Sequence, residues 1–247
     1  MLVLLPPSET KAPGGDGPPL RLDELSHPEL TATRRKLVDE LVELAGQDVA
    51  GLTALGLSER QYGELERNAM LWTAPTLPAL RRYTGVLYDA LDVGSLRPAE
   101  RARAGARLAV ASALFGLLRA DDPVPAYRLS AASSLPGLGT VRMVWRPVLP
   151  ALLAGLTGLV VDLRSAAYIM LGPVPDAVTV RVICEDGRGR RRTVSHHNKA
   201  HKGRLARLLA MAPREVTDIA GVVRVARRAG LEVERTGEHA LDVVLTD

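Results

Sequence analysis

The sequence predicts an α/β or α+β fold in one domain, with a sheet wrapped by helices. Two observations favour this fold: short apolar runs that suit buried strands occur at both ends of the chain, and amphipathic helical patterns fill the region between them. The length of 247 residues, with 47% hydrophobic residues, suffices for one large core. We therefore expect a single domain over residues 1–247, whose sheet uses strands from both termini.

The first elements alternate between a strand, a loop and helices. Met1–Leu5 is an apolar run that two prolines stop, so we expect a buried strand. The loop 8–19 is rich in glycine and proline and is typical of a connection leaving a sheet. Apolar residues recur at helical spacing in Thr31–Ala45, which predicts an amphipathic helix. Two short helices, Asp48–Leu55 and Ser58–Asn68, are expected around a glycine turn.

The second half of the chain begins with a long helical pattern. We expect one helix over Arg97–Arg119, the longest of the chain, which Pro123 and Pro125 end. The segment 126–129 is then expected to be extended. The remaining predicted elements are a helix Pro147–Leu156, strands Leu159–Leu163 and Val178–Cys184, a hairpin tip Glu185–Arg192 with Thr193–Ser195 pairing back, helices Lys199–Met211 and Glu215–Ala229, and strands Leu231–Arg235 and Ala240–Leu245.

Composition excludes several classes of protein. No window reaches the roughly 18 uninterrupted apolar residues of a membrane span, so we expect no membrane partner. The N-terminal apolar run lacks a preceding basic region and is therefore not expected to be a signal peptide. The single cysteine, Cys184, excludes an internal disulfide framework and a multi-thiolate metal site. A cytoplasmic protein is expected, while its oligomeric state stays open.

The positive charge is clustered, although the net charge is only +4. From Arg181 to Arg207 the chain has nine basic residues and two acidic ones, which fits either a solvated face or an anion site. Only four of the 32 basic residues are lysines, and the abundance of Ala, Arg, Val, Leu and Gly suggests a coding bias toward arginine. Because an ammonium group can be tuned toward neutrality and a guanidinium cannot, these lysines indicate a lysine-specific role, unless their retention is chance.

The first candidate site follows the first strand. Ligands of open α/β sheets bind just beyond strand ends, and there Ser8, Thr10 and Lys11 could together hold a phosphate or a carboxylate. The segment is not a Walker loop, because its glycines follow the lysine. A solvated loop is the alternative.

The second candidate site is the start of the helix near Asn198. There the helical amides could converge on an anion with Lys199, Lys202 and Arg204. His197 and His201 have the i, i+4 spacing of a metal-binding pair, but the segment lacks the glutamate of an HExxH motif, and two lysines would repel a cation. We therefore expect neither a metal nor another cofactor.

The third candidate site lies around Arg119 and the proline-stiffened turn after it. Tyr127 and Arg128 could be presented rigidly to a ligand there, with Arg119 as a further cation. Alternatively, Arg128 pairs with Asp121 or Asp122 inside the fold.

The two short helices over residues 48–68 form the fourth candidate. Helices around a glycine turn can make a helix-hairpin-helix, which grips the DNA backbone through loop amides. Ser58 stands where such a hairpin usually has a second glycine, and acidic residues follow it. An ordinary helical hairpin therefore stays open as the alternative.

Five segments in order resemble one known family over nearly the full chain: PPSETK, ALFGLLRADDPVPAYRLS, VWRPVL, VDLRSAAY and VSHHNKAHKGRLAR. They are similar to the YaaA family of bacterial peroxide-stress proteins. Ser8 and Lys11 fall on its "PPSEGK" start, residues 115–129 on its "LYGVLRPLD…PYRL" segment, and residues 199–203 on its "AKKARG" stretch. The resemblance implies one α/β domain with a positively charged cleft and a helix-hairpin-helix-like element, DNA binding, and a role in lowering free iron under peroxide stress.

The leading expectation is DNA binding, and two other functions are its alternatives. It would be non-specific binding of duplex DNA through phosphate contacts, because the chain has only eight aromatic residues for stacking on bases. One alternative is an enzyme acting on a phosphorylated or carboxylated small molecule, with a lysine of lowered pKa as base or nucleophile. The other is iron binding by His196, His197 and His201. The DNA contacts would come from Arg128, Lys199, Lys202, Arg204 and the hairpin Arg188–Arg192, and the enzyme's pocket would use Ser8, Lys11, Tyr127, Arg128 and Lys199.

Overall fold

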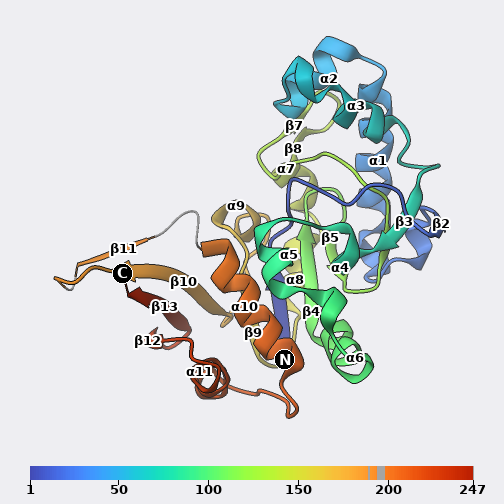
Figure 1. Ribbon diagram of the computed structural model, residues 1–247. Coiled ribbons are helices and arrows are strands. Elements are labelled where there is room, and N and C mark those ends of the chain that lie inside the picture. Colours follow the sequence, from blue (N-terminus) through green and yellow to red (C-terminus); the bar gives the residue numbers. More distant parts are fainter. Residues whose placement is uncertain (189, 194–197, 247) are drawn as a thin grey trace.

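A computed structural model describes residues 1–188, 190–193 and 198–246. A large, mostly parallel sheet runs through the molecule (Figure 1). Its strands are β1 (Leu2–Leu5), β4 (Leu108–Ser112), β5 (Gly116–Arg119), β9 (Val160–Asp162), β10 (Val178–Glu185), β11 (Arg191–Thr193), β12 (Val233–Gly237) and β13 (Ala240–Thr246). Their spatial order is β12-β13-β10-β9-β1-β4-β5, with β11 paired to β10.

The central strands β4, β1, β9, β10 and β13 are parallel. All four residues of β1 are buried, as expected for a strand covered on both faces. Because parallel strands end at the same edge, the chain segments that follow β1, β4 and β9 lie at one edge of the sheet. We call this edge, with residues 6–11, 112–115 and 163–164, the carboxyl edge.

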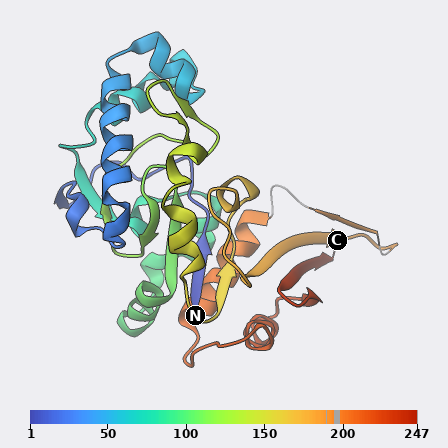
Figure 2. The same cartoon turned by 180° about the vertical axis from the view of Figure 1, so that it is seen from behind.

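Helices cover both faces of the sheet. The helix α10 lies against β1 and β10 and packs on α5 and α6, and α8 lies on the opposite face (Figure 2). The helices are α1 (Thr31–Ala45), α2 (Asp48–Leu55), α3 (Tyr62–Ala69), α4 (Ala79–Arg82), α5 (Val86–Leu91), α6 (Pro98–Arg107), α7 (Val141–Trp145), α8 (Leu149–Ala154), α9 (Ala166–Ile169), α10 (Asn198–Met211) and α11 (Ile219–Arg228). Among the described residues, no helix is both long and apolar enough to cross a membrane.

The contact between α10 and α5 depends on Gly203. A Cβ atom at this position would overlap the carbonyl oxygen of Leu87 and would lie 2.9 Å from the Cβ of Ala90. Glycine therefore allows the two helices to approach more closely than any other residue would. This contact fixes where the first turns of α10 lie relative to the carboxyl edge.

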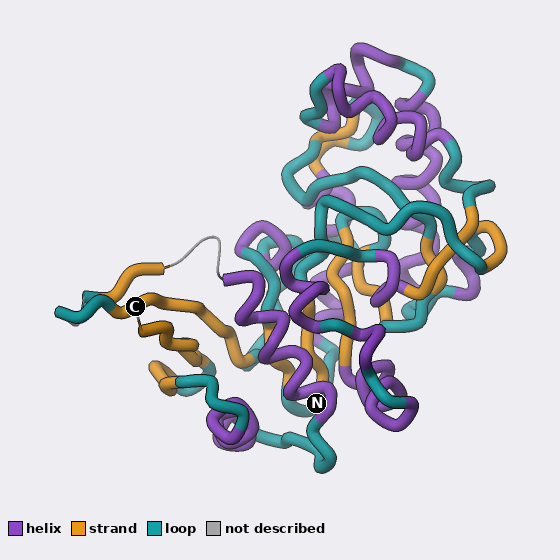
Figure 3. Tube along the Cα trace, in the orientation of Figure 1, coloured by secondary structure: helices purple, strands orange, loops and turns teal. Residues whose placement is uncertain are grey.

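The helices α1, α2 and α3 pack together at the end of the molecule farthest from β12 and β13 (Figure 3). Two small sheets complete the fold. The first consists of β2 (Gly17–Pro19), β3 (Pro75–Pro78) and β6 (Pro123–Val124), and the second of β7 (Ser134–Leu135) and β8 (Gly139–Thr140).

Many predicted elements are confirmed, but the prediction of one long helix over Arg97–Arg119 is wrong. The helix α6 ends at Arg107, and the chain continues as the antiparallel strands β4 and β5. Residues 108–118 are all buried, so the apolar run belongs to a strand pair covered on both faces rather than to one helical face. Gly116 has φ +73° and allows the tight reversal between the strands. The longest described helix is instead α1.

The predicted helix Glu215–Ala229 begins later than expected. Its first residue is Ile219, because the side chain of Asp218 accepts a hydrogen bond from the backbone N–H of Gly221 and caps the helix there. The following strand is shifted in the same direction and covers Val233–Gly237. Ser195, expected to pair back from the hairpin, lies outside the described residues.

Candidate functional site

The side chain of Lys11 is turned into the protein at the carboxyl edge. Its Nζ donates hydrogen bonds to the carbonyl oxygens of Ser8 at 3.0 Å and Glu9 at 3.2 Å. The same atom lies 4.2 Å from the ring centroid of Tyr127, and Lys11 is only 8% exposed. Lys11 is therefore buried, whereas Glu9 and Thr10 of the same segment are exposed to solvent.

A chain of hydroxyl groups lies beneath Lys11. The hydroxyl of Tyr127 is 2.7 Å from Ser112 Oγ and 2.8 Å from the hydroxyl of Tyr83. Ser112 Oγ also accepts a hydrogen bond from the backbone N–H of Phe115. Burial raises the pKa of Tyr83 to about 12 and that of Tyr127 well above its ordinary value, so both phenols stay protonated at neutral pH.

The environment of Lys11 makes its amine unusually acidic. Burial, and next the positive charge of Arg128, lower the pKa of Lys11 from 10.5 to about 7, although Glu64 and Glu9 act in the opposite direction. A neutral amine has two N–H groups, which match the two carbonyl oxygens of Ser8 and Glu9. Its lone pair is then unused by these contacts.

Arg128 pairs with Glu9, with 3.1 Å between Nη1 and Oε2. Neither aspartate of the sequence-based alternative is its partner: Asp121 pairs with Arg101, and Asp122 accepts hydrogen bonds from other segments. The guanidinium of Arg128 is thus beside Lys11 rather than locked in an internal ion pair with the turn before it.

Asn68, from α3, fixes the backbone of Arg128. Its side-chain amide donates to the carbonyl oxygen of Arg128 and accepts from its N–H, at 2.9 and 2.8 Å. The preceding residue, Arg67, pairs with Glu64 at 2.6 Å, and both act on the pKa of Lys11. Helix α3 therefore contributes charges to the site, although its sequence carries no pattern that indicates this role.

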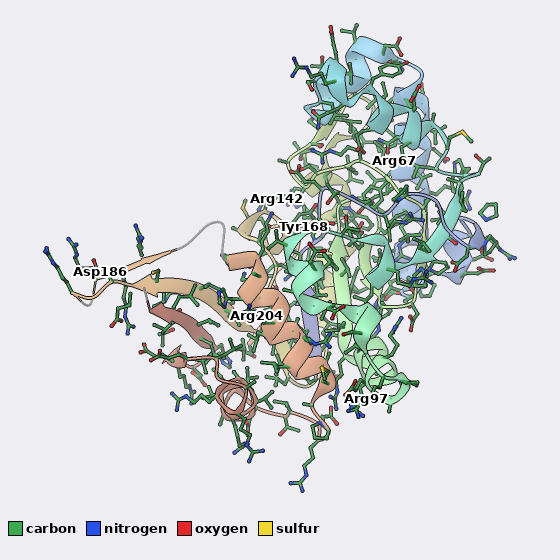
Figure 4. All side chains as sticks on the ribbon, viewed as in Figure 1. Arg67, Arg97, Arg142, Tyr168, Asp186 and Arg204 are labelled. Atoms are coloured by element: carbon green, nitrogen blue, oxygen red, sulfur yellow. The ribbon has the colours of Figure 1, made fainter. Side chains whose placement is uncertain are left out.

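Other aromatic residues of the site were also missed. Tyr88 donates to the carbonyl oxygen of Pro6 and stacks on Tyr83, with 5.6 Å between ring centroids. Tyr168 lies on α9 and is partly buried, and burial, followed by the effect of Tyr83, raises its pKa (Figure 4). Their spacing in the sequence gives no signal, because they lie on separate elements that only the fold brings together.

Lys202 approaches the carboxyl edge from α10. Its Nζ donates to the carbonyl oxygen of Leu163 at 3.0 Å, and burial lowers its pKa. Lys199 and Arg204 are exposed and have no hydrogen bond or ion pair with any described residue. The structure thus brings together four of the residues that were predicted to converge: Ser8, Lys11, Tyr127 and Arg128. Lys199 and Arg204 instead stay on the surface of α10.

Arg119 lies away from this site. It ends β5, which is antiparallel to β4 and pairs Arg119 with Ala109, so the residue is displaced from Ser112 along the strand. Its guanidinium donates to the carbonyl oxygen of Ala106. Arg119 therefore has a structural role, because it holds a carbonyl group near the end of α6.

The basic hairpin is largely paired with acidic neighbours. Arg190 pairs with Asp186 at 2.9 Å, and Arg191 pairs with both Glu185 and Glu234. Within residues 1–188, 190–193 and 198–246, no group of three or more His, Cys, Asp and Glu side chains could hold a metal ion. His196 and His197 lie outside that part of the chain.

A cavity of about 730 Å³ lies between the loop 212–218 and α11. Glu215, in this loop, pairs with the amine of Met1, which directly precedes β1. Because Met1 is at the start of that strand, the cavity is at the edge of the sheet opposite to Lys11 and is separate from the site.

Comparison with known proteins gives one consistent family. The family model described as peroxide stress protein YaaA matches residues 1–236. A UPF0246 protein of Corynebacterium efficiens is 50% identical over 238 residues, covering 95% of each chain. UPF0246 proteins of Corynebacterium glutamicum and Streptomyces coelicolor are each 46% identical, over 97% and 95% of this chain and 97% and 92% of their own lengths. With a match over nearly its full length, the chain belongs to the YaaA family of peroxide stress proteins.

Proposed function

We propose that this protein is an enzyme that acts on an anionic small molecule at the carboxyl edge, with Lys11 as base or nucleophile. The observation that supports it is the amine of Lys11, which is buried, has a pKa of about 7 and uses no lone pair in its contacts. Near neutral pH such an amine is neutral in about half of the molecules, as a lysine base or nucleophile requires.

The neighbouring residues have separate roles in this proposal. Arg128 binds the phosphate or carboxylate of the substrate in place of Glu9, whose side chain is 78% exposed and free to leave. Ser8 fixes the loop, because its Oγ accepts from the N–H of Thr84 while its carbonyl oxygen orients the amine. Tyr127 supplies the surface on which the amine rests.

The test measures the reactivity of individual lysines. Pyridoxal 5′-phosphate provides an aldehyde beside a phosphate: the amine adds to the aldehyde, water leaves, and borohydride reduces the imine to a stable secondary amine. Peptide mapping should find Lys11 labelled far more than the exposed Lys36 and Lys199 near pH 7, with Lys11→Arg as the control that removes the label. Labelling confined to Lys36 and Lys199 would contradict the proposal.

A second function, non-specific binding of duplex DNA, is favoured by exposed cations on α10 and at the tip of the β10–β11 hairpin. Arg188, Lys199 and Arg204 make no side-chain hydrogen bond or ion pair with any described residue, so they are available for phosphates. In this proposal the cations shield DNA in the cytoplasm and help to limit iron-driven damage. The helical pair α2 and α3, with Gly56 in its turn at φ +64°, is the proposed additional backbone contact.

Salt-dependent titration tests DNA binding. A labelled duplex is titrated at two salt concentrations with the wild type and with Lys199→Ala/Arg204→Ala. Loss of two phosphate contacts should reduce the slope of log affinity against log salt by about two. The matched control is Lys36→Ala/Arg228→Ala, which removes two exposed charges on α1 and α11, away from both proposed DNA contacts. Binding that does not change with salt would exclude this function, and Lys199→Arg should preserve binding.

A further inference from the structure

We infer that the substrate of the Lys11 site has two anionic groups, one held by Arg128 and the other by Arg67. This inference rests on the proposed function and specifies its substrate class. It assigns to Arg67, a residue of α3, a role in substrate recognition (Figure 4).

The two arginines are arranged alike. Each guanidinium holds one carboxylate of this chain, Arg128 that of Glu9 at 3.1 Å and Arg67 that of Glu64 at 2.6 Å. A carboxylate bound by an arginine shows that a planar anion with two oxygens fits beside that guanidinium, because its oxygens match the guanidinium donors. The site thus displays two carboxylate positions beside one amine.

The two arginines are linked through Asn68, and both positive charges act on the amine of Lys11. Arg67 directly precedes Asn68, whose side chain makes two hydrogen bonds with the backbone of Arg128. Both positive charges disfavour the charged form of Lys11, while Glu64 and Glu9 favour it. All five charged groups therefore belong to one cluster at the carboxyl edge.

Both positions can be reached from solvent. The side chain of Arg67 is 33% exposed and that of Glu64 is 27% exposed, whereas Arg128 is 15% exposed beneath the exposed Glu9. An incoming molecule with two anionic groups can replace both carboxylates, whereas a monoanion can replace only one.

The experiment compares how small carboxylates protect Lys11 from labelling. Lys11 reacts with formaldehyde, which has no charge, in the presence of acetate, malonate, succinate or glutarate, and borohydride then reduces the imine to a methylated amine. One further arginine contact should make at least one dicarboxylate protect Lys11 about tenfold better than acetate. The variant Arg67→Gln should lose this advantage, while the matched control Arg60→Gln, in the neighbouring turn, should keep it.

The outcomes separate the inference from the proposed function. If Lys11 is labelled readily but acetate and all dicarboxylates protect equally, the two-anion inference is wrong and the reactive lysine stands. If Lys11 is not labelled faster than Lys36, the proposed function itself fails. Retention of the dicarboxylate advantage in Arg67→Gln would also overturn the role of Arg67.

Discussion

The amine of Lys11 lies on the face of the Tyr127 ring, 4.2 Å from its centroid, where the ring favours a cation while burial disfavours it. Burial and Arg128 prevail, so the pKa falls to about 7. The same pair connects the loop after β1 with the segment after β5, two regions more than a hundred residues apart. A reactive amine here therefore depends on the tertiary fold.

Stability should depend on pH through Lys11. The pKa is about 7 in the folded protein and 10.5 in the unfolded chain, so between these values the unfolded chain binds the extra proton and rising pH favours folding. The difference in unfolding free energy between wild type and Lys11→Met should therefore increase by up to about 1.4 kcal/mol per pH unit. Urea titrations of both proteins from pH 7 to 10 measure it. A constant difference would show that the pKa is unshifted.

Replacement of Gly203 by alanine should destabilise the protein by about 1–3 kcal/mol, because the new Cβ atom overlaps the backbone of α5 at Leu87. The matched control is Gly63→Ala in α3, where the nearest atom to the new Cβ is Glu66 Oε2 at 3.9 Å. This second change should stabilise by about 0.4–1 kcal/mol. Thermal and urea unfolding distinguish the two. Equal effects would mean that α10 can move away from α5.

Loss of the Tyr127 hydroxyl should cost more than loss of the Tyr83 hydroxyl. Tyr127→Phe removes both hydrogen bonds of that hydroxyl and takes one hydrogen-bond partner from the buried hydroxyl of Tyr83, at a cost of about 1–3 kcal/mol. Tyr83→Phe leaves the bond between Tyr127 and Ser112 in place and should cost about 1 kcal/mol. Urea unfolding of both variants gives the order, and the reverse order would contradict the hydroxyl chain.

Removal of the Asn68 side chain should affect both stability and the acidity of Lys11. Asn68→Ala leaves the N–H and carbonyl groups of Arg128 without partners, at a cost of roughly 2 kcal/mol or more. With Arg128 less firmly held near the amine, the pKa of Lys11 should rise, since Arg128 lowers it in the wild type. The pH dependence of Lys11 labelling measures this shift. An unchanged profile would indicate that Asn68 is only structural.

Local patterns predicted much of the fold. The helix Thr31–Ala45 has the predicted bounds, because its apolar spacing is set by one exposed and one buried face. The helix predicted over Arg97–Arg119 failed for the opposite reason: a run buried on all sides has no periodicity that separates helix from strand. Whether such a buried run forms a helix or a strand depends on which strands lie beside it, and this is a property of the whole sheet.

The part of the candidate site that could be predicted from the sequence is the segment directly after the first strand. Lys11 could be singled out because a lysine is rare in this chain and stands just beyond a buried strand. Arg67 and Asn68 could not be, since they belong to a helix whose surface charges look ordinary in sequence. Their role depends on α3 lying against the segment around Arg128, a contact between residues 60 positions apart.

In the proposed enzyme, the ion pair of Glu9 with Arg128 selects among anions before they reach the amine of Lys11. Because Glu9 belongs to the same chain, its carboxylate competes with every incoming anion at the high effective concentration of an intramolecular partner. Chloride and other abundant weak binders are therefore held off the guanidinium. A molecule displaces Glu9 only when its further contacts offset that competition, so affinity at this position depends on how many groups the molecule engages together.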